Sequence, residues 1–128
     1  MCHANYTTVV LGEAVRQRKL LSLEQAVEMM TDRPARHYGL RHRGRIAEGW
    51  HADLVVFDPT RIASLPTTVE RDLPGGGERL HAGSVGVDHV FVGGGEVVTE
   101  GVVTDERSGR VLRSGRDTDT VTLADVRR

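Results

Sequence analysis

Histidine is the residue type that most directly suggests chemistry, because the chain has six histidines and imidazole nitrogens commonly bind zinc. Zinc sites show recognisable spacings, such as two histidines one residue apart or a His-Glu-x-x-His helix turn. Neither spacing occurs among His3, His37, His42, His51, His81 and His89. Cys2 is the single cysteine, which excludes a cysteine-rich zinc site and an intrachain disulfide. We therefore predict no metal ligand in this chain.

The remaining reactive side chains predict no active site of their own. Asp53 precedes an apolar run, where a carboxylate more often accepts backbone hydrogen bonds from the preceding turn than acts as a base. His89 is expected to pack across strands, and His51 to be solvated beside a turn. The serines lack a Gly-x-Ser-x-Gly elbow, and the two glycine triplets lack the strand and helix that flank a phosphate loop. We predict no catalytic residue.

Composition narrows the class of protein. The 17 basic and 18 acidic residues are interspersed and give a net charge of -1, so no one-signed surface for nucleic acid is expected. No apolar run approaches the roughly 18 residues of a membrane span, and Met1 is not followed by a signal-like segment. We expect no nucleic-acid or membrane partner and a cytoplasmic location.

The first part of the chain is expected to form helices. Apolar pairs four residues apart predict a helix over about Val9 to Arg18, with Thr7 or Thr8 as its N-cap and Gly12 as a weak point. A second helix is predicted over residues 23–30, where an apolar stripe follows a Ser-x-x-Gln capping box.

Residues 31–33 are expected to break the second helix, Pro34 to occupy the first position of a short third helix, and Gly39 to end that helix in a left-handed turn. The chain then becomes extended. Residues 44–50 predict a short strand and turn, and residues 52–57 a strand whose unbroken apolar run requires cover on both faces.

The second half of the chain predicts turns and strands. Residues 59–84 contain three prolines and a glycine triplet, which predict a long surface loop. Residues 87–98 predict a hairpin around Gly93-Gly94, followed by a strand at 102–103 and a last short strand at 110–113. The tail from residue 114 is polar. Helices before strands, without alternation, predict an α+β fold.

Two long segments resemble a known family. Residues 21–40, LSLEQAVEMMTDRPARHYGL, are followed closely by residues 44–58, GRIAEGWHADLVVFD, and together they resemble the C-terminal end of the amidohydrolase superfamily. Residues 88–98, DHVFVGGGEVV, are similar to the hairpin that closes those proteins, with Gly93 where asparagine is usual. The D-aminoacylase group is most similar, because NYTTVVLGE at 5–13 and LRSGRD at 112–117 also match its members.

The resemblance implies a position within a larger fold. Residues 1–43 would form a loop and the last helices of a (β/α)8 barrel, and residues 44–113 the C-terminal half of a β-sandwich with a long loop at 59–84. Residues 114–128 would form a polar tail. The family's metal-binding histidines and catalytic aspartate have no counterpart here, so zinc is implied for a parent enzyme and not for this chain.

The implied function is that of one part of an N-acyl-D-amino-acid deacylase, in which metal-activated water hydrolyses an amide. This part alone is expected to be inactive. The resemblance places His3, Asn5 and Tyr6 on a loop beside the active-site mouth, as substrate-binding candidates. Their alternative role is to structure that loop.

Two other functions are kept open: a non-catalytic binding or assembly module, and part of a cyclic-amide hydrolase similar to hydantoinases and dihydroorotases. The expected partner is the N-terminal remainder of the enzyme or a second copy of this chain, because a strand without cover exposes its edge. In the parent, the small-molecule partner would be an N-acyl-D-amino acid.

Overall fold

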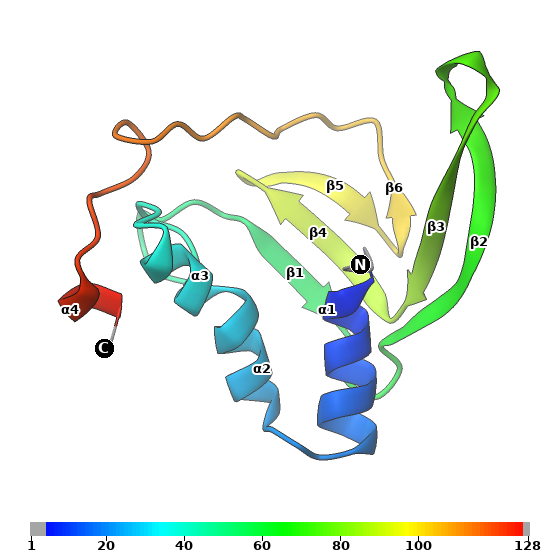
Figure 1. The fold of residues 1–128 in the computed structure, drawn as a ribbon, viewed down its shortest axis with the longest axis horizontal. Coiled ribbons are helices and arrows are strands. Elements are labelled where there is room, and N and C mark those ends of the chain that lie inside the picture. The colour runs from blue at the N-terminus through cyan, green and yellow to red at the C-terminus, as the bar shows by residue number, and fades with distance from the viewer. Residues whose placement is uncertain (1–4, 127–128) are drawn as a thin grey trace.

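A computed structural model describes residues 5–126 of the chain, so the predicted site residue His3 lies outside the described part. Figure 1 shows the helices of the first forty residues beside a small sheet, with one long hairpin projecting away from both. Helices come first and most strands later, which confirms the α+β class. No helix among residues 5–126 is long and apolar enough to cross a membrane.

The first helix begins earlier than predicted. It runs as α1 (Tyr6–Val9) and continues without a break into a π-helix, η1 (Val10–Gln17). Thr7 and Thr8 lie inside it, so neither is the N-cap; that position belongs to Asn5. The Thr8 hydroxyl instead donates to the Asn5 carbonyl at 2.9 Å, which stabilises the first turn.

The second helix is confirmed, whereas the third begins earlier than predicted. α2 (Leu23–Met30) starts at a complete capping box, in which Ser22 and Gln25 each bond the other's backbone N–H. Two orphan donors at the helix start are thereby satisfied. α3 (Asp32–His37) follows directly after Thr31, so Pro34 is its third residue and not its first.

The apolar stripe of α2 packs on the first helix to form a small core. Leu11, Ala26 and Ile62 are buried at its centre, and Phe57 and Val87 from the strands pack against it. Gly12 is also buried, and a Cβ added there would lie 2.9 Å from the Ile62 carbonyl oxygen. The glycine therefore permits a close approach that an alanine would prevent.

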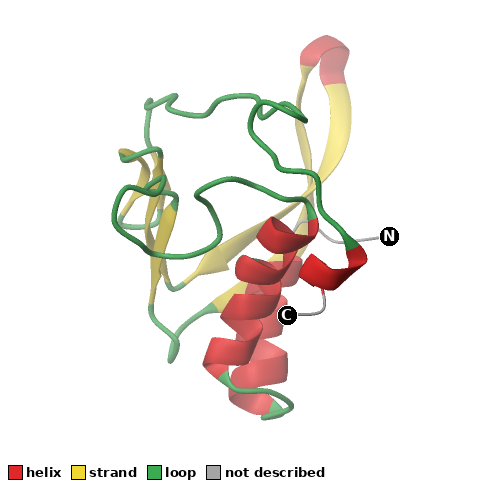
Figure 2. Cartoon of the chain, turned by 90° about the vertical axis from the view of Figure 1, so that its left-hand side faces the viewer, coloured by secondary structure: helices red, strands yellow, loops and turns green. Residues whose placement is uncertain are grey.

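A four-stranded antiparallel sheet carries the order β1-β4-β5-β6. β1 (Leu54–Phe57) pairs only with β4 (Val87–Val92), which pairs with β5 (Gly95–Thr99), and β6 (Val102–Val103) completes the sheet. The predicted hairpin around Gly93-Gly94 is confirmed. Figure 2 shows the helices lying to one side of this sheet.

β1 is an edge strand with incomplete cover. Val55 and Val56 are 56% and 48% exposed, so the described residues do not supply all the cover that this apolar run requires. The segment 44–50, predicted to hold a short strand, forms turns instead. Gly44 and Gly49 have φ angles of +86° and +76°, which lie outside the strand region.

The prediction of a long loop at 59–84 is wrong, because most of this segment forms a two-stranded hairpin. β2 (Ala63–Leu73) pairs antiparallel with β3 (Gly77–Val85) through the short 3-10 turn η2 (Pro74–Gly76). The glycines and two of the three prolines that suggested a loop, Pro66 and Pro74, fall in this turn or at breaks in register. Those breaks lie between Ser64 and Thr67 and between Glu70 and Leu73, so the strands pair despite them.

The polar tail docks on the third helix. Residues 104–117, which we call the strap, contain no regular strand, so the short strand predicted at 110–113 is wrong. The strap leads from β6 back toward the helices, as Figure 1 shows. Leu40 then forms an isolated bridge with Thr118, and a final short helix, α4 (Leu123–Val126), follows.

Candidate functional site

The two substrate-binding candidates within the described residues occupy different environments. The Asn5 amide nitrogen contacts the Ser64 hydroxyl at the base of the β2–β3 hairpin. The Tyr6 side chain is 56% exposed at the start of α1. Asn5 therefore ties the start of α1 to the hairpin, while Tyr6 is more than half exposed.

Asn5 has a structural role through its backbone, but among residues 5–126 one polar atom of its side chain is unpaired. Its backbone carbonyl accepts from the Thr8 hydroxyl and from the Val9 amide, which fixes the helix start. Its side-chain oxygen is buried, and within residues 5–126 it has no hydrogen-bond partner. A buried amide oxygen without a donor is costly. The role of His3, Asn5 and Tyr6 in binding substrate remains a prediction.

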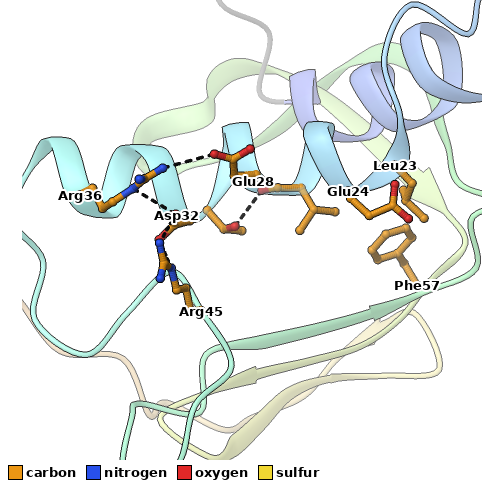
Figure 3. A pocket seen from close by; sticks show the side chains of 9 residues that line it. Leu23, Glu24, Glu28, Asp32, Arg36, Arg45 and Phe57 are labelled. Carbon is orange, nitrogen blue, oxygen red and sulfur yellow. Dashed lines mark hydrogen bonds and ion pairs between the residues drawn. The ribbon is translucent and has the colours of Figure 1, made fainter. Parts of the chain in front are cut away.

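A separate groove lies between α2 and β1. Figure 3 shows this groove, which has a volume of about 690 Å³. Leu23, Val27 and Phe57 supply apolar walls toward one end. Charged side chains from α2, α3 and the loop before β1 form the other end: Glu28, Asp32, Arg36 and Arg45.

Asp32 organises the charged end. Its side chain is 12% exposed and accepts two hydrogen bonds from Arg45, at 2.5 and 2.9 Å. Arg36, one helical turn on, approaches the same carboxylate at 3.0 Å. The Arg45 hydrogen bond lowers the pKa of Asp32, burial opposes that change, and the charge of Arg36 lowers it further.

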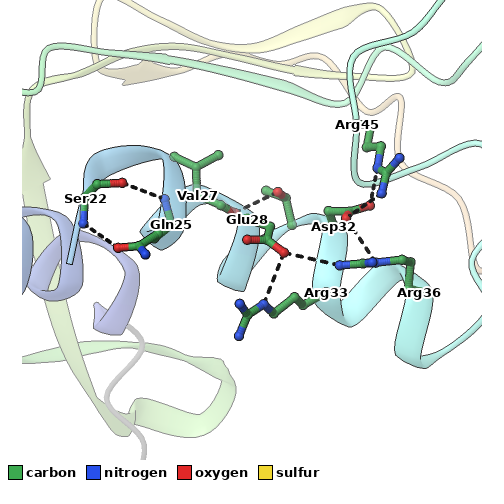
Figure 4. Close-up of polar contacts among 9 residues, drawn as sticks. Ser22, Gln25, Val27, Glu28, Asp32, Arg33, Arg36 and Arg45 are labelled. Atoms are coloured by element: carbon green, nitrogen blue, oxygen red, sulfur yellow. Dashed lines mark hydrogen bonds and ion pairs between the residues drawn. The ribbon is translucent and has the colours of Figure 1, made fainter. Parts of the chain in front are cut away.

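Glu28 extends the same network along the helix. It accepts hydrogen bonds from Arg33 and Arg36, both at 3.2 Å, and Figure 4 shows these contacts beside the Ser22–Gln25 capping box. Each carboxylate is paired with guanidinium groups, so both serve as ion-pair partners within the chain. The groove offers an apolar contact surface closed by a structural ion-pair network.

The residues first considered for chemistry also have structural partners. Asp53 accepts a hydrogen bond from the Gly93 amide at 2.8 Å and forms an ion pair with Arg43. It therefore supports a turn, as the sequence suggested, but the β4–β5 turn and not the preceding one. His89 Nδ1 lies 2.7 Å from a Glu96 oxygen on the neighbouring strand.

A metal does not fit the described residues. Among residues 5–126, no group of three or more histidine, cysteine, aspartate or glutamate side chains could hold a metal ion. Structural zinc usually takes four protein ligands and catalytic zinc three. We therefore derive no catalytic step through a metal from this chain's own side chains.

Comparison with known proteins supplies the context for these surfaces. The sequence profile described as the amidohydrolase family matches residues 2–98, most of the chain. The chain belongs to the amidohydrolase family. Within this family it is 42% identical over 106 residues to an N-acyl-D-glutamate deacylase of Alcaligenes xylosoxydans xylosoxydans, and 38% identical over 113 residues to an N-acyl-D-aspartate deacylase of the same organism.

A solved structure of D-aminoacylase, from a study of that enzyme's binuclear metal centre, matches with a TM-score of 0.62 and 36% identity. The match covers 82% of this chain and 20% of that one. The two deacylases are likewise covered over 20% of their length, against 83% and 84% of this chain. The chain thus spans about one fifth of the length of these amidohydrolase relatives.

The groove between α2 and β1 and its ion pairs were not predicted from the sequence. Asp32 had no predicted role, because the third helix was expected to begin at Pro34 and not at Asp32. Arg45 comes from a loop thirteen positions further along the chain. Nothing in their spacing indicated the contact, because it depends on how that loop folds back toward α3.

Proposed function

We propose that this chain forms the C-terminal part of a metal-dependent N-acyl-D-amino-acid deacylase and is inactive by itself. The observation that carries this proposal is the match to two deacylases of that substrate class over more than four fifths of the chain. Since the described residues do not fit a metal, the metal-binding and catalytic groups, with zinc as the expected metal, would belong to the remaining part.

The surfaces of the chain support a role as one part of a larger fold. The groove beside α2 and the open edge of β1 lie next to each other, and both expose apolar side chains. In the proposed enzyme, α2 and α3 are the last helices of the barrel and the sheet is half of a β-sandwich. The N-terminal remainder would then cover β1, and a second copy of the chain would do so when the remainder is absent.

A complementation experiment tests the proposal. One of the matching deacylases is truncated to remove the segment equivalent to this chain, and the truncated protein is co-expressed with this chain. The pair is then assayed with N-acetyl-D-glutamate for release of D-glutamate. We expect hydrolysis by the pair, loss of hydrolysis with a chelator, and no activity from either part alone.

The truncated deacylase combined with its own removed segment is the matched control. If that control pair is active and the pair with our chain is inactive, the deacylase assignment is wrong. Metal-dependent hydrolysis by the 128-residue chain alone would instead contradict its proposed inactivity. A non-catalytic assembly module, the alternative, predicts binding to the truncated deacylase without restored hydrolysis.

A further inference from the structure

Two small cavities share one wall on the side of the sheet crossed by the strap. They have volumes of about 330 and 140 Å³, and the side chains of Arg43, His51 and Arg110 line both of them. Arg43 and His51 come from the loops before β1, and Arg110 comes from the strap. Two guanidinium groups from distant parts of the sequence therefore meet in one hollow.

Arg43 is held firmly in this wall. Its side chain is only 14% exposed and pairs with Asp53, whose other oxygen accepts from the Gly93 amide at 2.8 Å. This arrangement fixes the guanidinium at the edge of the larger cavity. One carboxylate does not occupy all five N–H donors of an arginine.

Arg110 lacks a carboxylate of its own among the described residues. It lies 3.6 Å from an Asp117 oxygen, but Arg116 holds the other oxygen of that carboxylate at 2.8 Å. Its Nη2 also lies 3.3 Å from His51 Nε2. Positive charge therefore exceeds negative charge around the cavities.

The charged groups repel one another here. Burial lowers the pKa of Arg43, the positive charge of Arg110 lowers it further, and the negative charge of Asp117 offsets part of this change. Burial likewise lowers the pKa of His51, with added repulsion from Arg43 and Arg110. A bound anion would relieve this repulsion, because an opposite charge stabilises each cationic form.

We propose that this pair of cavities binds a small oxyanion, a phosphate or a carboxylate, through Arg43 and Arg110. Guanidinium groups match the geometry of such anions because they present paired donors. His51 lines the same wall, and its Nε2 accepts from Arg110 when that nitrogen carries no proton, which holds the guanidinium beside the hollow. The proposal does not depend on the deacylase assignment, since it rests on these side chains alone.

Trp50, the only tryptophan, provides a direct reporter. It adjoins His51, and its ring lies 5.9 Å from that of His42, which lines the smaller cavity. We expect sodium phosphate or sodium acetate, titrated at constant ionic strength into the full 128-residue chain, to change Trp50 fluorescence in a saturable way. Sodium chloride at the same ionic strength should give no saturation.

Gly109 allows a matched pair of variants that leaves the arginines in place. It lines the larger cavity, and a Cβ added there meets no heavy atom within 4 Å. Gly109→Asp introduces a competing carboxylate and should weaken anion binding by at least about tenfold. Gly109→Asn, which has the same shape without the charge, should bind within about twofold of the original chain.

Arg110→Gln and Arg107→Gln form a second pair on the strap. Arg110→Gln should abolish saturation, whereas Arg107, which bonds only strap carbonyls in the described structure, should be replaceable. Circular dichroism checks that each variant is folded. Equal responses to phosphate, acetate and chloride, or unchanged binding in both Gly109→Asp and Arg110→Gln, would overturn the proposal.

Discussion

Asp32 connects three parts of the chain through one carboxylate. It begins α3, pairs with Arg36 on the same helix and accepts a bidentate contact from Arg45 in the loop before β1. Because the side chain is mostly buried, loss of its charge would leave two guanidinium groups facing a weaker acceptor. Asp32 thereby holds the helices against the loop that leads into the sheet.

Asp32→Asn should lower the free energy of unfolding by about 1–3 kcal/mol at pH 7. The pKa of Asp32 is lowered in the folded chain, so its stabilisation is present above the unfolded value of about 3.9 and is lost as pH falls through the folded pKa. Urea unfolding at several pH values should therefore show the two proteins converging in acid.

Asp72→Asn is the control for Asp32→Asn. Asp72 pairs with Arg79 on the exposed hairpin, where solvent weakens an ion pair, so the substitution should change stability little. A difference between Asp32→Asn and the original chain that persists unchanged at low pH would contradict the role given to the Asp32 charge.

Single residues were predicted well only where their partners are close in sequence. The Ser22–Gln25 capping box and the hairpin turn at Gly93-Gly94 followed from local patterns. His51 was expected to be solvated, yet it lines a cavity against Arg110, fifty-nine positions away. Such a contact depends on the path of the strap, which no local pattern encodes.

At the level of elements, the first helix depends on one close approach. Gly12 lies where the helix meets the Ile62 carbonyl, and an added methyl group would lie 2.9 Å from that oxygen. Helix propensity alone predicts that alanine would stabilise the helix by up to about 1 kcal/mol. The contact with Ile62 predicts the opposite.

Gly12→Ala should therefore destabilise the chain by about 1–3 kcal/mol, because the helix must move away from the core. Thermal unfolding measures the effect. Glu13→Ala, at the next and exposed position of the same helix, serves as the control and should be nearly neutral. An increase in melting temperature for Gly12→Ala would show that the close approach is unimportant.

The hairpin of β2 and β3 shows why one element was not predicted. Its prolines and glycines are typical of loops, and they do mark its turn and its breaks in register. Between those points, residues 67–70 and 79–82 pair regularly across the two strands. Cross-strand pairing decided the structure, and it cannot be inferred from either strand alone.

For the whole molecule, the open edge of β1 exposes apolar side chains that another strand could cover. β1 ends the sheet, and Val55 and Val56 are about half exposed. We expect the isolated chain to self-associate through this edge, since exposed apolar edge strands pair with other strands. Sedimentation velocity over a range of concentrations measures this association.

Val55→Lys should shift the chain toward monomer, because a charged side chain on an edge strand disfavours pairing. Val111→Lys is the matched control: Val111 is 76% exposed but lies in the strap, outside any strand. A monodisperse monomer for the unmodified chain, or equal effects of the two lysines, would contradict association through β1.

The docked tail has a kinetic consequence. Arg41 pairs with Asp119 across 78 positions, next to the bridge between Leu40 and Thr118. Closing so long a segment costs more chain entropy than forming the helices or the β4–β5 hairpin, whose contacts are local. The tail should therefore dock last during folding and detach first under mild denaturant, so that the two ends of the chain report on different stages of the same reaction.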